Sequence, residues 1–301
     1  MSMRTYGFFG KTSFLLGVIL FFFAATVCFL EPTDGHTGAT LNTGYHFDFD
    51  QVSKGPYLNL KSAILVNYDN GEVLYAKNAD LVRPVASISK LVAAMVVLDK
   101  GIDLNRTAII TREDARRSSR SRLRVGSKLS LLDLLHAALI SSDNRATRAL
   151  ARATSGSIDA FGREMNDKAE RMGLEHTVFY EPTGLDTRNV STAHEVARII
   201  HYACDYDAIA RITSLKTHRV KLLNRKNSYC NLSNTNRLLW SPYRVLAGKT
   251  GYIRAADYCL TALVRNSKGE RLTLVTLGVP GDRLRFKESR RLLDWGFRKV
   301  S

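Results

Sequence analysis

The feature that most constrains this chain is a serine placed three residues before a lysine, at the start of an apolar helical run. The stretch is Pro84-Val85-Ala86-Ser87-Ile88-Ser89-Lys90-Leu91-Val92. On a helix, positions i and i+3 share a face, so Ser87 and Lys90 can meet, whereas Ser89 points elsewhere. A serine hydroxyl becomes a nucleophile when a neighbouring base takes its proton, and a lysine held neutral by its surroundings is such a base. The stretch therefore predicts acyl-transfer chemistry on Ser87.

Composition indicates an ordinary globular protein with a strong excess of positive charge. The 301 residues are 45% hydrophobic and 24% charged, and the net charge is +16. Such a charge suits an anionic partner, and the densest basic run is Arg116, Arg117, Arg120, Arg122 and Arg124. No nucleic-acid motif accompanies this run, so we predict a solvated basic face and no nucleic-acid partner. An acidic wall polymer or an anionic substrate is the alternative.

The N-terminal residues predict a membrane segment. Arg4 and Lys11 precede a continuous apolar run over residues 14–30, which is the lower limit for a spanning helix. Positive charge before the run keeps that end in the cytoplasm, so the rest of the chain is exported. We predict that residues 1–30 are an uncleaved anchor in the inner membrane or a signal peptide, that residues 31–54 are a linker, and that residues 55–301 form one domain.

Cysteines and histidines give no sign of a metal or redox site. Beyond Cys28, in the apolar run, the chain has Cys204, Cys230 and Cys259, and no spacing fits a zinc site or a redox pair. A Cys204–Cys230 disulfide stays open, and Cys259 is expected to be buried. The seven histidines show no spacing typical of metal ligands, so no metal and no cofactor are predicted.

The order of predicted elements favours an α/β (α+β) fold. Strands are expected over residues 63–66, 73–75, 107–111, 258–265 and 271–279, with a hairpin turn at Asp69-Asn70-Gly71. Helices are expected from Ser87 to about 99 and over residues 131–140, 146–153, 159–172 and 285–298. A Thr192-x-x-Glu195 capping box predicts one more helix, which ends at 203. Hairpin-joined strands around a helical block predict an antiparallel sheet with helices on both faces, plus a helical lobe and a cleft between the two.

Three short motifs carry the functional signal. They are Ser87-x-x-Lys90, Ser142-Asp143-Asn144 at a break between two helices, and Lys249-Thr250-Gly251 before the strand that contains Cys259. Each alone is as easily a helix cap or a plain turn. All three, in this order and in these settings, predict a single active site.

The three motifs together resemble those of the penicillin-recognising serine enzymes, which are the D,D-peptidases and the serine β-lactamases. Further segments resemble the D-alanyl-D-alanine endopeptidases and carboxypeptidases of bacterial periplasms, over roughly residues 57–298. These segments are Arg83-Pro84-x-Ala86-Ser87-Ile88-Ser89-Lys90-Leu91, Glu181-Pro182-Thr183-Gly184-Leu185, Asn189-Val190-Ser191-Thr192-Ala193, Asn234-Thr235-Asn236 and Lys249-Thr250-Gly251-Tyr252. The resemblance implies a β-lactamase/D,D-peptidase-like fold and a periplasmic location.

The resemblance also implies roles for the residues that carry out the reaction. Ser87 would be the nucleophile, Lys90 its base, and Ser142 a proton shuttle towards the leaving amine. Asn144 would hold Lys90 and the substrate amide. The backbone N–H groups of Ser87 and Tyr252 would form the oxyanion hole.

A second set of residues would bind the substrate. Lys249 would add positive charge that lowers the pKa of Lys90 and attracts the substrate carboxylate, which Thr250 would bind through its hydroxyl. Gly251 would let the substrate backbone approach closely. Arg285, with Arg283 as a rival, would face the same carboxylate from the start of the last helix.

The resemblance does not decide between several activities. The first hypothesis is an endopeptidase that cleaves D-alanyl cross-links to diaminopimelate in peptidoglycan stem peptides, with β-lactam antibiotics as covalent inhibitors. Alternatives are a D-alanyl-D-alanine carboxypeptidase, a serine β-lactamase, and a penicillin-binding wall sensor without activity. The Glu-x-x-Leu-Asn pattern of β-lactamases is absent, because the residues that follow Glu181 do not have this spacing. Asp257 and Ile253 depart from residues that many relatives have, near the edge of the pocket.

Overall fold

A computed structural model of the chain describes residues 45–50, 52–116 and 121–301. They all belong to one unit, Thr40–Ser301. The predicted anchor or signal segment and linker residues 31–44 lie outside the described residues, as do Arg117 and Arg120 of the basic run. In the described ranges, none of the helices has the length and apolar character needed to cross a membrane.

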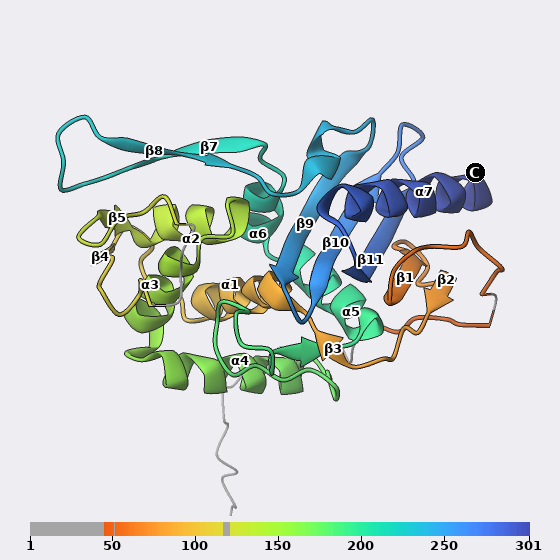
Figure 1. Cartoon of the computed structure of the whole chain (residues 1–301), viewed down its shortest axis with the longest axis horizontal. Coiled ribbons are helices and arrows are strands. Elements are labelled where there is room, and N and C mark those ends of the chain that lie inside the picture. Colours follow the sequence, from red (N-terminus) through yellow and green to blue (C-terminus); the bar gives the residue numbers. More distant parts are fainter. Residues whose placement is uncertain (1–44, 51, 117–120) are drawn as a thin grey trace, which may run out of the picture. The chain divides into compact units, whose positions relative to one another are not determined.

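A five-stranded antiparallel sheet, in the order β2-β1-β11-β10-β9, forms one half of this unit (Figure 1). Its strands are β1 (Ser62–Asn67), β2 (Val73–Lys77), β9 (Arg244–Ile253), β10 (Asp257–Arg265) and β11 (Arg271–Val279). Four of them are the predicted strands 63–66, 73–75, 258–265 and 271–279, and the β1–β2 turn contains Gly71 at a φ of 77°. β9 is an edge strand, paired on one side with β10.

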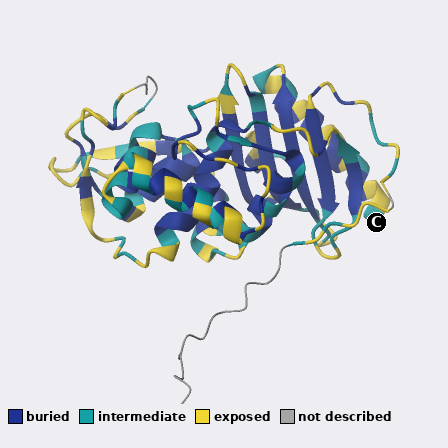
Figure 2. Cartoon of the chain, turned by 90° about the horizontal axis from the view of Figure 1, so that it is seen from below, coloured by how far each residue is buried: buried dark blue, intermediate teal, exposed yellow. Residues whose placement is uncertain are grey.

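Helices cover both faces of the sheet, which confirms the predicted fold class. Alternate residues of β1 belong to two different cores: Ile64 and Val66 to one, and Ala63 and Leu65 to the other. The second core contains the apolar side of α7 (Asp282–Val300), and the first contains α5 (Ala193–Cys204). The strands are therefore buried along most of their length, as Figure 2 shows.

The helical lobe packs around a central buried helix. Its elements are η1 (Ala86–Ser89), α1 (Lys90–Asp99), α2 (Leu131–Ile140), α3 (Asn144–Ser155), α4 (Ile158–Arg171) and α6 (Asp207–Thr213). In α1 every residue from Lys90 to Val97 is buried, so a core helix carries the functional lysine. Side chains of Ser130, Asp143 and Ser157 cap the next three helices.

The Thr192 helix begins as predicted, but only half of the capping box forms. Thr192 Oγ1 accepts a hydrogen bond from the Glu195 N–H at 3.0 Å. The Glu195 carboxylate instead accepts from His176 N at 2.9 Å and from Thr177 Oγ1 at 2.5 Å. A buried carboxylate thus joins the helix start to the loop that follows α4.

Several short strands and one long strand were not predicted from the sequence. The missed short strands are β3 (Arg83–Pro84), β5 (Lys128–Ser130), β6 (Val190–Ser191), β7 (Thr217–Lys221) and β8 (Tyr229–Ser233), whereas β4 (Thr107–Ile109) was expected. The alternative interpretation of Lys249-Thr250-Gly251 as a plain turn is wrong, because all three residues lie inside β9. Two glycines and a lysine give β9 a low strand propensity, so it forms because of its tertiary contacts.

Gly296 shows how closely α7 packs on the sheet. A Cβ at Gly296 would lie 2.3 Å from Leu65 Cδ2 and 3.0 Å from Leu272 Cδ1, whereas a Cβ at the helical Gly162 would meet its nearest neighbour at 3.4 Å. We expect Gly296→Ala to lower the free energy of unfolding by about 1–3 kcal/mol through overpacking. Gly162→Ala should be neutral or stabilising. Urea unfolding of both variants tests this, and equal stabilities would contradict it.

Candidate active site

Ser87 and Lys90 meet as the sequence predicts. Ser87 lies in the 3-10 turn η1 and Lys90 is the first residue of α1, and their Oγ and Nζ atoms are 2.9 Å apart. Ser87 is half-buried and Lys90 is only 1% exposed. The hydroxyl is therefore reachable from solvent, while the amine that could take its proton is not.

Two further contacts fix the Lys90 amine. Nζ lies 2.5 Å from the Thr183 carbonyl oxygen and 2.8 Å from Asn144 Oδ1. A neutral amine has two N–H donors and one lone pair, and the two oxygens can only accept. The lone pair is then left for the hydroxyl hydrogen of Ser87. The geometry thus suits a neutral lysine poised to accept a proton.

Burial gives Lys90 the protonation state that this chemistry needs. It lowers the pKa of Lys90 to about 7, against the opposing effects of Glu181 and Asp143. The stem of the lysine contacts an apolar gap lined in part by Val97, Leu135 and Phe161. The largest cause is this desolvation, and not the charge of Lys249 that the resemblance implied.

The Glu181 loop presents the Thr183 carbonyl to Lys90. The buried carboxylate of Glu181 accepts hydrogen bonds from Thr183 N at 2.8 Å, Thr183 Oγ1 at 2.5 Å and Leu185 N at 2.7 Å. Gly184 has a φ of +79°, and a Cβ there would lie 2.0 Å from the Ala86 oxygen. Sequence reasoning missed Thr183 because a backbone carbonyl leaves no side-chain signal, although the loop itself was noted.

The second motif lies where α2 ends and α3 begins. Ser142 adopts a φ of 58°, and its Oγ is 2.9 Å from Lys249 Nζ. Asp143 accepts hydrogen bonds from the Arg145 and Ala146 N–H groups, so the middle residue of the motif is a helix cap. Its neighbours Ser142 and Asn144 are thereby turned towards the two lysines.

The third motif brings the edge strand β9 against η1. Lys249, Thr250 and Gly251 are all buried. A Cβ at Gly251 would lie 2.8 Å from the Val85 oxygen and 3.2 Å from Ser87 N, so glycine permits this approach of η1. From the sequence, Gly251 was expected to allow the close approach of a substrate backbone, and not of η1. The contact also brings Ser87 N close to the residue before Tyr252, as a two-donor oxyanion hole requires.

The remaining predicted residues have different surroundings. Tyr252 is half-exposed, and its ring stacks on Tyr258 with centroids 4.2 Å apart. Arg285 is buried and donates from Nη1 to the Gly251 and Cys259 carbonyl oxygens, each at 3.1 Å. It therefore supports the strand from behind. Burial lowers the pKa of Lys249 well below its usual value, and the positive charges of Lys90 and Arg285 lower it further.

The structure also settles the conformation of Asp257 and the state of Cys204, Cys230 and Cys259. Asp257 has a φ of +55°, a conformation that glycine adopts without strain. Cys204, Cys230 and Cys259 are free, and Cys259 is buried as expected. The open possibility of a Cys204–Cys230 disulfide is thus not realised.

Comparison with known proteins agrees with the fold and with the class of enzyme. The profile of the D-alanyl-D-alanine carboxypeptidase family matches residues 50–281. A D-alanyl-D-alanine endopeptidase of Pseudomonas aeruginosa is 35% identical over 78% of this chain and 76% of its own length. One of Escherichia coli is 35% identical over 80% and 78%. The DD-transpeptidase of Streptomyces K15 has a TM-score of 0.76 at 25% identity, covering 82% of this chain and 100% of that chain.

The chain therefore belongs to the D-alanyl-D-alanine carboxypeptidase family, whose members are serine D,D-peptidases. It is a hydrolase with the fold of the β-lactamases and penicillin-binding proteins.

The pKa of Lys90 predicts how acylation depends on pH. Only the neutral amine can accept the Ser87 proton, so the rate constant for acylation by benzylpenicillin should fall about tenfold for each unit below pH 7 and level off above pH 8. Stopped-flow or quenched labelling measures it. Lys90→Arg should not acylate at any of these pH values, because arginine stays protonated. Equal rates at pH 5.5 and pH 8 would show that Lys90 is not the base.

Proposed function

We propose that this protein is a D,D-endopeptidase that cleaves D-alanyl cross-links to diaminopimelate in peptidoglycan, through an acyl-enzyme on Ser87. The observation that supports its chemistry is the 2.9 Å contact between Ser87 Oγ and Lys90 Nζ, with the lysine buried. A serine beside a buried lysine of pKa about 7 is a nucleophile with its own base.

The proposed reaction has two steps. Ser87 Oγ attacks the carbonyl carbon of D-alanine, and its proton moves to Lys90 as the C–O bond forms. The N–H groups of Ser87 and Tyr252 stabilise the negative oxygen. Ser142, hydrogen-bonded to Lys249, then passes its proton to the amine as the C–N bond breaks, and the proton held by Lys90 replaces it, so that Lys90 is neutral again. Water next attacks the ester carbonyl and gives a proton to Lys90, which returns it to Ser87 as the ester C–O bond breaks.

Substrate binding is proposed to use the free edge of β9. An extended peptide can add to an exposed sheet edge through main-chain hydrogen bonds. The side chain at the edge, Thr250, shares a 2.5 Å hydrogen bond with Thr235, so two hydroxyls lie together where a carboxylate would bind. Lys249, in the same strand, attracts it, while Asn144 faces the substrate amide. Arg285 acts through the Gly251 carbonyl instead of contacting the carboxylate.

Preference for cross-links is supported by the similarity to two proteins named endopeptidases, each 35% identical to this chain. The carboxypeptidase activity named for the family is the second candidate, in which a terminal D-alanine leaves in place of diaminopimelate. Both use the same acyl-enzyme, and they differ only in the amine that leaves.

A β-lactamase function and a sensor function are less well supported. In a β-lactamase, a glutamate positions the water that frees the serine, but the Glu181 carboxylate already accepts hydrogen bonds within its own loop. A wall sensor without activity has no need for the complete set of Ser87, Lys90, Ser142 and Lys249. We therefore propose that β-lactams form a long-lived adduct on Ser87.

The proposed location is the periplasm. The relatives are bacterial cell-wall enzymes, and the apolar run over residues 14–30 would export the domain or anchor it to the inner membrane. In this proposal residues 31–54 link the segment to the catalytic domain. The described end of this linker contacts the domain: Phe47 packs on the first core, and Val73 N donates to the Asp48 oxygen at 2.7 Å.

Replacement of the nucleophile tests the mechanism. Ser87→Ala should abolish both penicillin labelling and peptide cleavage, a loss of at least about 10³-fold, because no other group attacks the carbonyl. Gel labelling with fluorescent penicillin and chromatography of muropeptides measure the two losses. His194→Ala, which removes a histidine hydrogen-bonded to Asp80, is the control and should retain both activities. Cleavage that persists in Ser87→Ala would refute the acyl-enzyme.

The choice of substrate needs a separate assay. We expect the protein to convert D-alanyl-diaminopimelate cross-linked dimers to monomers faster than it removes the terminal D-alanine of a monomeric pentapeptide. Mass spectrometry of the products distinguishes the two. Faster release of terminal D-alanine would make the protein a carboxypeptidase, without affecting the role of Ser87.

A further inference from the structure

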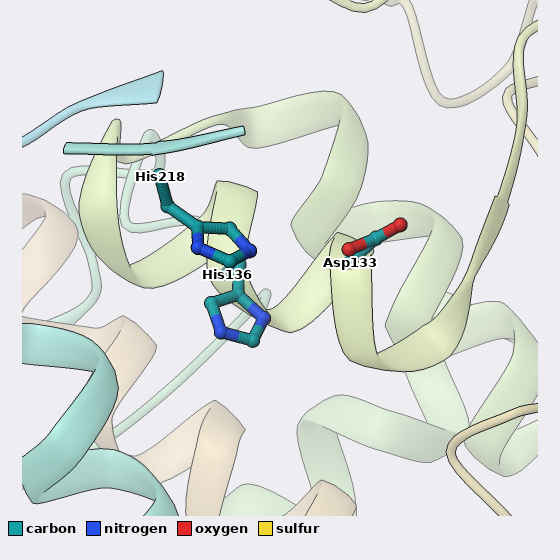
Figure 3. Close-up of side chains that lie close together, drawn as sticks. All are labelled: Asp133, His136 and His218. Atoms are coloured by element: carbon teal, nitrogen blue, oxygen red, sulfur yellow. The ribbon is translucent and has the colours of Figure 1, made fainter. Parts of the chain in front are cut away.

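Three metal-ligating side chains gather on a surface that the proposed reaction does not use. Asp133 and His136 lie on α2, and His218 comes from β7, which packs against that helix. One ligand atom from each lies within 4.8 Å of the others, and all three residues are half-buried. Figure 3 shows the two imidazoles one above the other, with the Asp133 carboxylate beside them on the same helix as His136.

The orientation of His136 leaves one ring nitrogen available. Nδ1 lies 2.8 Å from the Leu132 carbonyl oxygen, which can only accept, so Nδ1 carries the hydrogen. Nε2 then has a free lone pair. Histidines that bind metals are commonly fixed by such a bond from the second nitrogen to a backbone carbonyl.

His218 supplies the second nitrogen. Its ring stacks on that of His136, with centroids 4.0 Å apart and an angle of 15° between the planes. A tetrahedral ion with ligand distances of 2.0–2.2 Å needs donor atoms about 3.4 Å apart, closer than the 4.8 Å within which one ligand atom of each residue lies, so side chains must move to bind it. Figure 3 shows Nδ1 of His136 on the side towards Asp133, so binding through Nε2 requires the His136 ring to turn as well as the half-buried His218 ring.

Asp133 supplies the oxygen and the negative charge. It precedes His136 by three residues, so both side chains lie on one face of α2. The N–H of Lys221 is 3.4 Å from Asp133 Oδ2, a weak contact that leaves the carboxylate able to bind an ion. Without this carboxylate, a cation would meet only neutral ligands in a protein of net charge +16.

We propose that Asp133, His136 and His218 bind a divalent transition-metal ion, with Zn²⁺ as the best fit, outside the Ser87 site. Two imidazole nitrogens and one carboxylate oxygen are a ligand set that Zn²⁺ accepts, with water in the fourth position. The ion joins the β7–β8 ribbon to α2. Thr235, after β8, donates from its N–H to the Ile140 carbonyl at the end of α2, so the ion strengthens an existing junction. Binding to the folded state alone raises its stability.

Metal titration of the untagged protein, freed of metal with a chelator, tests the proposal. We expect one Zn²⁺ per chain by calorimetry and a rise in Tm. Co²⁺ should give the visible absorption of a tetrahedral site without the thiolate charge-transfer band that binding to Cys204 or Cys230 would produce. His218→Gln, His136→Gln and Asp133→Asn should each weaken binding at least tenfold. His194→Gln is the matched control and should bind normally.

Two results would overturn the proposal. One is the absence of stoichiometric Zn²⁺ binding to the wild-type protein, which would make the stacked histidines a packing contact only. The other is unchanged affinity in His218→Gln. Penicillin acylation should persist in all variants and reports that each is folded. Should His136→Gln fail to fold, His218→Gln and Asp133→Asn decide the question.

Discussion

The site depends on one constraint, the complete burial of a lysine at the start of a core helix. Lys90 is 1% exposed, and its pKa falls from 10.5 to about 7. A shift of this size corresponds to a cost on the order of 5 kcal/mol to the folded state. The cost applies in full below pH 7, where both folded and unfolded states are protonated, and it disappears as the pH rises towards 10.5. Burial of Lys90 therefore lowers the stability of the fold, but it provides a base that is neutral near physiological pH.

The surrounding structure makes this burial tolerable and useful. Thr183 and Asn144 provide two acceptors for the amine, so the neutral form keeps its hydrogen bonds. Backbone conformations that are strained for ordinary residues lie close by, at Ala86 with a φ of 49° and Ser142 with a φ of 58°. The conformation of Ala86 persists because Gly184 and Gly251 let the loop and the edge strand pack closely against η1. Strain and close packing thus place the hydroxyl of Ser87 beside its base.

Much of the fold was predictable from local patterns, and the errors have physical causes. Alternation and turn residues identified four strands of the sheet, and the apolar period identified α2 with its bounds, Leu131–Ile140. β9 escaped because its Gly-Lys-Thr-Gly run lacks strand propensity, and long-range pairing with β10 decides its state. The i, i+3 spacing was enough to predict that Ser87 meets Lys90. The junction of Ser142 with Lys249, 107 residues away, came only from the motif order and the resemblance.

Several contacts could not be predicted from the sequence, because they depend on a backbone carbonyl or on the packing of distant elements. The Thr183 carbonyl and the Glu181 carboxylate that orients its loop have no distinctive spacing, and the position of Arg285 behind β9 follows from the packing of α7. The His136–His218 pair is similar, since the two residues belong to elements far apart in sequence. Such pairs become visible only when the topology is known.

The role of Lys90 as a buried base can be tested by measuring its pKa. NMR titration of the protein with ¹³C-labelled lysine side chains follows each amine, and the signal missing from Lys90→Arg assigns Lys90. We expect a midpoint near 7 for Lys90. A midpoint near 10, as for an exposed lysine, would contradict the claim that burial prepares the base.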